Sequence, residues 1–244
     1  MAGIKRATSV GDPMPPVNGF ESNSVKVCNP MSQILVIGAS QGIGFETTRA
    51  LLADGHHVRA FARSASTMSL ADTALQKISG DALDRADLAR ALQGVDIVVQ
   101  ALGVPMNLNS VLSGTTLFSR ATRILVDLMR DKGPKRLICV TGLGAGDSRG
   151  RFGMLYDGVM FPLVLKRVYD DKDIQERIVK DSGLDWTIAR PGVLVSSPVT
   201  GRYRALADPA DWDFKTVARA DVARFIADEV RDAKFLHKTP LIIQ

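Results

Sequence analysis

Short runs of apolar residues alternate with longer amphipathic segments along most of the chain. The runs lack the strict apolar/polar alternation of a sheet with one wet face, so they are typical of parallel strands covered on both faces. They lie at residues 34–37, 57–62, 75–78, 95–101, 136–141, 186–189 and 241–243. This pattern predicts a buried parallel β-sheet.

The segments between these runs have the periodicity and the end signals of helices. Leu117, Ala121 and Leu125 recur on one helical face, and Gly133-Pro134 is a strong stop signal after them. The predicted helices cover residues 42–54, 85–92, 115–131, 166–181 and 221–231. Because strands and helices alternate, we predict an α/β fold with a doubly wound parallel sheet.

Residues 1–30 differ from the rest, since Pro, Gly and Asn interrupt them and no periodicity lasts a full helical turn. The 244 residues allow one large domain or two small ones, at roughly 150 residues per domain. We expect a flexible N-terminal arm at 1–30, either a partner-binding segment or a passive tail, and a single domain at 31–244.

Composition removes several classes of function. The net charge of +5 is spread among many acids, so a nucleic-acid partner is not expected. Two Cys and three His argue against a disulfide framework and against a metal site. Because neither a signal peptide nor a spanning helix is evident, we expect no membrane association and a cytoplasmic location. The oligomeric state stays open.

The glycine-rich turn after the first strand carries the strongest chemical signal. Gly38, Gly42 and Gly44 follow a buried strand and open a helix. The first glycine permits the tight turn, the second lets the backbone approach a pyrophosphate, and the third lets the helix pack on the strand. Backbone N–H groups at the helix start then hold the anion. The cofactor contacts expected in this turn are Gly38, Ser40, Gln41, Gly42, Ile43 and Gly44.

The Gly38-x-x-x-Gly42-x-Gly44 spacing resembles the fingerprint of the short-chain dehydrogenases/reductases, whose NAD(P)-binding domain has a Rossmann fold. The stretch from Ser182 to Gly192, SGLDWTIARPG, resembles the atypical branch that contains the NAD(P)H-binding NmrA-like and biliverdin/flavin-reductase-like proteins. The resemblance covers about residues 33–243. It implies further cofactor contacts after the third, fourth and sixth strands, at Asp81, Ala82, Ala101, Leu102, Gly103, Pro191 and Val193.

The second strand indicates which nicotinamide cofactor is used. Dinucleotide-binding folds usually place an acid about 20 residues after the glycines to hold the ribose 2′-hydroxyl. No Asp or Glu occurs between Gly55 and Ala71, and Arg63 stands nineteen positions after Gly44. A guanidinium there can bind a 2′-phosphate, so we predict NADP(H). Arg59 is a second candidate for this contact.

The resemblance also implies catalytic groups, with one departure from the family pattern. The family uses a Tyr four residues before a Lys, whereas Tyr169 precedes Lys172 by three. This spacing puts the side chains about 60° apart around a helix instead of about 40°. Lys172 is expected to hold the cofactor ribose; the alternative is that it is a solvated charge. Tyr169 is expected to supply a proton; the alternative is that it is a packing residue. Thr141 is the hydroxyl offered after the fifth strand, where Gly142 stands at the usual serine position.

A glycine-rich loop at 142–165 follows the fifth strand, and Arg149 and Arg151 lie in it. It is either a flap over a planar aromatic or anionic small-molecule substrate, or a flexible surface loop. We therefore predict an NADPH-dependent reductase that transfers hydride to a planar acceptor such as a quinone, a flavin or a related carbonyl. Two alternatives remain: a redox sensor that binds NADP(H) without turnover, and an epimerase- or dehydratase-like enzyme acting on sugar nucleotides.

Overall fold

The computed structural model describes residues 31–104, 116–145 and 166–244. An eight-stranded sheet runs through the molecule in the order β3-β2-β1-β4-β5-β6-β10-β8, and a separate pair joins β7 (Val193–Val195) to β9 (Thr216–Ala218). The strands of the large sheet are β1 (Gln33–Ile37), β2 (His57–Ala62), β3 (Leu75–Ser79), β4 (Ile97–Gln100), β5 (Arg136–Val140), β6 (Asp185–Pro191), β8 (Arg204–Leu206) and β10 (Leu241–Ile243). All neighbours in it pair in parallel except β8 with β10. The predicted doubly wound α/β fold is confirmed.

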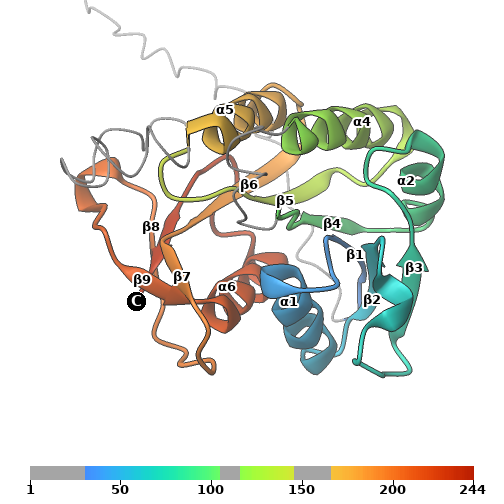
Figure 1. Ribbon diagram of the computed structural model, residues 1–244, viewed down its shortest axis with the longest axis horizontal. Coiled ribbons are helices and arrows are strands. Elements are labelled where there is room, and N and C mark those ends of the chain that lie inside the picture. Colours follow the sequence, from blue (N-terminus) through green and yellow to red (C-terminus); the bar gives the residue numbers. More distant parts are fainter. Residues whose placement is uncertain (1–30, 105–115, 146–165) are drawn as a thin grey trace, which may run out of the picture.

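Helices cover both faces of this sheet (Figure 1). On one face lie α1 (Gly42–Ala53) and α6 (Arg219–Asp232). On the other lie α2 (Arg85–Ala91), α4 (Leu117–Lys132) and α5 (Lys166–Lys180). Alternate residues of β1 serve the two layers, since Ile34 and Val36 pack with the first group and Leu35 and Ile37 with the second. This is the side-chain alternation expected of a strand buried on both faces.

The strand order reverses beside β1, because β1 pairs with both β2 and β4. The chain goes outward from β1 to β2 and β3, and then crosses back to β4 and continues the other way. Ligands of open α/β sheets bind in the crevice beyond the carboxyl ends of the strands at such a switch point. The turn that follows β1 therefore stands at the expected place for a ligand.

The C-terminal part holds elements that the pattern did not predict. The strands β7 (Val193–Val195), β8 and β9 (Thr216–Ala218) each span three residues and are partly exposed. Two short 3₁₀ helices were not predicted either: η1 (Ala65–Thr67), which lies between β2 and β3, and η4 (Pro209–Asp211), which lies between β8 and β9. Strands this short are too brief to show a period of two.

Two sequence-based expectations lie outside the described residues, namely the arm at 1–30 and most of the loop at 142–165, of which only 142–145 are described. Within the described ranges, no helix is both long enough and apolar enough to cross a lipid bilayer.

Candidate active site

The glycine turn after β1 has the geometry that its three glycines predict. Gly38 adopts φ +87°, and a Cβ there would stand 2.6 Å from the carbonyl oxygen of Ala101. A Cβ on Gly44 would stand 2.2 Å from the carbonyl oxygen of Gly38. Both positions exclude any side chain because backbone atoms already fill the space. The turn is thus held tightly against β4 on one side and against its own helix on the other.

Gly42 differs from the other two glycines, because nothing lies within 4 Å of where its Cβ would stand, and its φ is +60°. The space above the first turn of α1 is therefore open. Gln41, the N-cap residue, makes no side-chain hydrogen bond to the helix start. The first N–H groups of α1 lack a side-chain cap, which is how helix starts that bind phosphate are commonly built.

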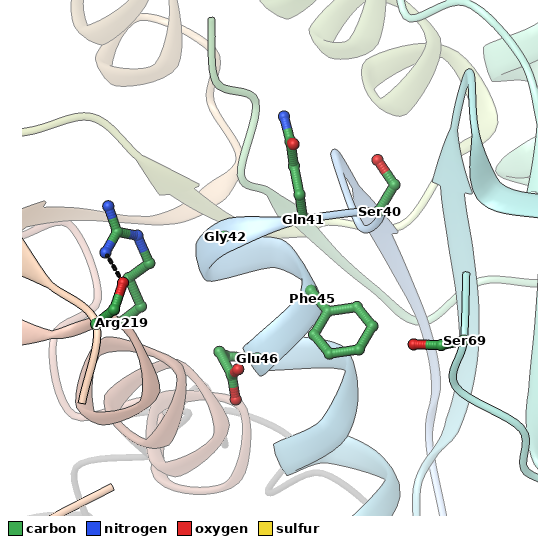
Figure 2. A pocket seen from close by; sticks show the side chains of 8 residues that line it. Ser40, Gln41, Gly42, Phe45, Glu46, Ser69 and Arg219 are labelled. Carbon is green, nitrogen blue, oxygen red and sulfur yellow. Dashed lines mark hydrogen bonds between the residues drawn. The ribbon is translucent and has the colours of Figure 1, made fainter. Parts of the chain in front are cut away.

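A pocket of about 470 Å³ adjoins this helix start (Figure 2). Ser40, Gln41 and Gly42 line it from the turn. Ser196 and Arg219 line it from the C-terminal part of the chain, more than 150 residues away in sequence. The pattern of the sequence did not single out these last two, since neither belongs to a local motif and only the tertiary fold brings them to the turn.

The carboxyl ends of β2 and β3 carry the groups predicted for the adenosine half of a dinucleotide. Arg63 follows β2 directly, is exposed, and makes no hydrogen bond or ion pair with the described residues. Arg59, the second candidate, instead binds Gln76 and the carbonyl oxygens of Ala91 and Gln93. Its guanidinium is engaged within the protein, so the structure favours Arg63 over Arg59 for this contact.

The residues after β3 and β4 also lie along this edge. Asp81 is exposed, and its carboxylate accepts a hydrogen bond from the N–H of Leu83 at 2.9 Å, which orders the turn before α2. Ala82 is buried. Ala101, Leu102 and Gly103 follow β4, and the N–H of Ala101 bonds to the carbonyl oxygen of Ile37 at 2.9 Å. Ala101 and Leu102 border the glycine turn, because a Cβ on Gly38 would approach their backbone atoms.

Lys172 of α5 reaches the end of β5. Its Nζ donates a hydrogen bond of 2.7 Å to the carbonyl oxygen of Thr141 and lies 4.4 Å from the centre of the Phe118 ring. Burial lowers the pKa of this ammonium from 10.5 to about 8, although the neighbouring Glu176 and Asp171 oppose the shift. The lysine therefore holds its charge less firmly near neutral pH than an exposed lysine does.

Tyr169 shares the same side of α5 and approaches the next residue of the β5 end. Its hydroxyl oxygen lies 3.1 Å from where a Cβ would stand on Gly142. The absence of a side chain at Gly142 thus makes room for the tyrosine hydroxyl. Despite the spacing of three residues, Tyr169 and Lys172 both meet the 141–142 segment, so the structure brings the two predicted groups together.

The third predicted group, Thr141, turns its hydroxyl toward the interior. Its Oγ1 donates a hydrogen bond to Oε1 of Glu176 at 2.9 Å, and Thr141 is 6% exposed. Glu176 in turn forms a bidentate ion pair with Arg190, with N–O distances of 2.9 Å and 2.6 Å. Arg190 is 0% exposed. The hydroxyl thus anchors the end of β5 to a buried ion pair, and a catalytic role for it stays a prediction.

The last predicted contacts lie at the end of β6 and the start of β7. Pro191 is buried, and its carbonyl oxygen accepts a hydrogen bond from the N–H of Leu143 at 2.9 Å. Gly192 is tightly enclosed, because a Cβ there would stand 2.3 Å from the carbonyl oxygen of Lys215. Val193 is 40% exposed, unusual for a large apolar residue in this fold. The exposed valine therefore offers an apolar surface beside the edge.

Comparison with known proteins identifies the family. Residues 38–233 match a family described as NAD(P)H-binding, which covers most of the chain. The chain belongs to this NAD(P)H-binding family. The predicted resemblance to the atypical short-chain dehydrogenases/reductases is confirmed at this level, and the chain is a Rossmann-fold protein of the NAD(P)-binding oxidoreductase type.

The relatives of this NAD(P)H-binding chain include a named reductase. A (4-alkanoyl-5-oxo-2,5-dihydrofuran-3-yl)methyl phosphate reductase of Streptomyces griseus is 28% identical over 167 residues, or 68% of this chain and 50% of that protein. The chain thus spans half the length of that relative. An uncharacterised chloroplastic protein of Arabidopsis thaliana is 27% identical over 87% of this chain and 73% of its own.

Solved structures confirm the Rossmann fold. An anaerobilin reductase from Escherichia coli O157:H7 superimposes with a TM-score of 0.72 at 24% identity, covering 87% of this chain and 97% of that one. A short-chain dehydrogenase/reductase from Veillonella parvula in complex with NADP gives a TM-score of 0.72 at 20% identity, covering 87% of this chain and 94% of that one.

The edge of the sheet fits the dinucleotide that this family binds. The open space at Gly42 and the uncapped start of α1 suit a pyrophosphate, whereas a Cβ at this position would project into that space. The Arg63 guanidinium makes no hydrogen bond with the described residues. It lies at the end of β2, where the ribose of the adenosine is bound in such folds. The residues present therefore match an NAD(P)H ligand in charge, shape and order along the edge.

Proposed function

We propose that this protein is an NADPH-dependent reductase that passes a hydride to a planar acceptor such as a quinone, a flavin or a related carbonyl. The observation that carries the proposal is the meeting of Lys172 and Tyr169 at the 141–142 segment. Two groups able to hold or move a proton stand there at the same edge as the glycine turn. When bound, NADPH supplies the hydride from its nicotinamide ring.

The chain offers a separate group for each part of this cofactor. The N–H groups at the start of α1 would bind the pyrophosphate, and Arg63 would bind the 2′-phosphate. No Asp or Glu follows β2 in the sequence before Asp72, so the usual acid that prefers the free 2′-hydroxyl is missing there. This arrangement favours NADPH over NADH.

Lys172 would hold the ribose and Tyr169 would present its hydroxyl to the acceptor. The lysine is anchored by the carbonyl oxygen of Thr141 and by the Phe118 ring, so its Nζ is restricted in position. Transfer of a hydride to a planar acceptor depends chiefly on orientation and on exclusion of water. A protein with only two such groups can therefore support this chemistry.

The names of the compared proteins support the reductase proposal. The relative from Streptomyces griseus and the structural neighbour from Escherichia coli are both named as reductases of small molecules. The first of these substrates carries a phosphate group, which agrees with the anionic or planar substrate proposed here.

A redox sensor that binds NADP(H) without turnover is the second candidate. It is favoured by the hydroxyl of Thr141, which is buried and engaged with Glu176. A site that lacks a third polar group at this position is less complete as a proton-transferring centre.

Oxidation of NADPH against a panel of quinones, flavins and aldehydes tests the two candidates. We expect turnover with at least one planar acceptor, a large loss in Lys172→Ala and a small one in Tyr169→Phe, because quinones and flavins can take protons from water. Tight binding of NADPH without turnover across the panel would overturn the reductase proposal. A large difference in affinity between NADP⁺ and NADPH would then support the sensor.

A further inference from the structure

Arg219 stands beside the glycine turn although 177 residues of sequence separate it from Gly42. The reason lies in the small β7–β9 pair. The two strands run parallel with Val195 opposite Ala218, so the residues that follow them, Ser196 and Arg219, emerge together. Nη1 of Arg219 donates to Oγ of Ser196 at 2.9 Å. This register places a fixed guanidinium at the start of α6.

Packing between α6 and α1 then carries that guanidinium to the cofactor edge. Leu51 of α1 shares a buried cluster with Val222, Phe225 and Ile226 of α6. Arg224 also binds Asp54, just beyond α1, with 2.9 Å between Nη1 and Oδ1. Figure 2 shows the Arg219 side chain beside the first turn of α1, across from Gly42. Two elements thus hold the cation next to the open helix start.

The guanidinium of Arg219 carries more N–H donors than its described hydrogen bond uses. It carries five N–H groups, and Ser196 accepts from it at Nη1. Among the described residues no carboxylate lies within ion-pair distance of it. Among the described residues, Glu46 is the one acid that lines the pocket, and it pairs with Arg49 at 2.9 Å. Counting Arg49 with the lining residues, two arginines face one carboxylate, so the described surroundings of the pocket carry one net positive charge.

We propose that Arg219 binds the pyrophosphate of the nicotinamide cofactor and contacts it from the side opposite the glycine turn. The inference rests on the proposed binding of NAD(P)H at that turn. It assigns the two arginines of this edge to different phosphates. Arg63, at the end of β2, serves the 2′-phosphate that only NADP(H) carries, whereas Arg219, beside Gly42, serves the pyrophosphate common to both cofactors.

Because the two arginines are assigned to different phosphates, their variants should change the affinities for NADPH and NADH in different ways. Fluorescence titrations of NADPH and NADH are made with the full chain and with the variants R219A, R63A and R123A. We expect R219A to weaken both cofactors by about tenfold, or about 1.4 kcal/mol. R63A should weaken NADPH alone. R123A, which removes an exposed arginine of α4 outside the pocket lining, should change neither affinity.

R219K keeps a cation of similar length without the planar fork, so an intermediate loss for both cofactors is expected, and it replaces R219A should that variant fail to fold. Thermal unfolding midpoints show whether each variant is intact. Unchanged affinities in a folded R219A overturn the proposal, and so does a loss confined to NADPH, which would make Arg219 a ligand of the 2′-phosphate. Because every readout is a binding constant, a chain that binds both cofactors and reduces no acceptor refutes the reductase proposal alone.

Discussion

Nζ of Lys172 and the carbonyl oxygen of Thr141 lie 2.7 Å apart, joining the middle of α5 to the end of β5. The bond fixes the lysine beside Gly142 and the Tyr169 hydroxyl. It also keeps an ammonium group partly buried against the face of Phe118. A charge held in this way depends on pH in a manner that an exposed lysine does not share.

The first prediction concerns this pH dependence. The folded chain releases the Lys172 proton near its pKa of about 8, whereas the unfolded chain holds it up to about 10.5. Between these values the unfolded state binds more protons, so the free energy of unfolding rises with pH. Relative to K172M, the wild type should gain at least about 1 kcal/mol across this window, since one pKa unit corresponds to about 1.4 kcal/mol. Denaturant unfolding at several pH values measures the gain.

The exposed residue Lys238 supplies the control for that experiment. K238M removes a lysine in solvent, so its unfolding free energy should follow the wild type in parallel over the same pH range. Parallel profiles for the wild type and K172M would instead show that the Lys172 charge is not destabilised by folding.

The second prediction concerns Arg63 and cofactor choice. Since this guanidinium is exposed at the end of β2 and no acid replaces it, NADPH should bind at least about tenfold more tightly than NADH, or about 1.4 kcal/mol. R63A should remove most of the difference by weakening NADPH. Titrations of nicotinamide or tryptophan fluorescence measure both affinities. Equal affinities in the wild type would contradict the assignment.

The third prediction concerns Gly42. An alanine Cβ there meets nothing within 4 Å, but it projects into the space proposed for the pyrophosphate. G42A should therefore weaken both cofactors strongly while costing about 1 kcal/mol of stability from its positive φ. G55A is a matched control, because Gly55 also has a positive φ and an open Cβ position, at the other end of α1. It should lose similar stability and keep cofactor affinity. Equal binding losses in the two variants would refute the idea.

The fourth prediction concerns the buried ion pair of Glu176 and Arg190. Removing the carboxylate in E176A leaves a fully buried guanidinium without its bidentate partner, at a cost of about 3–5 kcal/mol. The double variant E176M/R190M removes both charges and should cost less than E176A. Denaturant unfolding compares the two. If the double variant is the less stable of the pair, apolar packing around Arg190 matters more than its charge.

The fifth prediction concerns the N-terminal arm. Every residue proposed to hold the cofactor lies after Met31, from Gly38 to Arg219. A chain that begins at Met31 should therefore fold and bind NADPH within a few-fold of the full chain. An insoluble product, or one that fails to bind, would place the domain boundary before residue 31.

Much of this protein could be predicted from local patterns. The ranges 57–62 and 241–243 coincide with β2 and β10, and the glycine spacing placed Gly38 and Gly44 where backbone contacts exclude a side chain. Such features rest on burial of short apolar runs and on steric limits of the backbone, and both are expressed within a few neighbouring residues. The absence of an acid after β2 is equally local, and it is what pointed to Arg63.

Tertiary structure alone decided the rest. The strands β7 and β9 are three residues long, and their pairing depends on a partner more than twenty residues away. That pairing and the packing of α6 on α1 bring Arg219 to Gly42. Likewise, Arg59 and Arg63 both belong to the β2 region, and only the contacts of Arg59 with Ala91 and Gln93 show which arginine is engaged within the protein. Which side chains share a site is set by long-range contacts, and no short stretch of sequence records them.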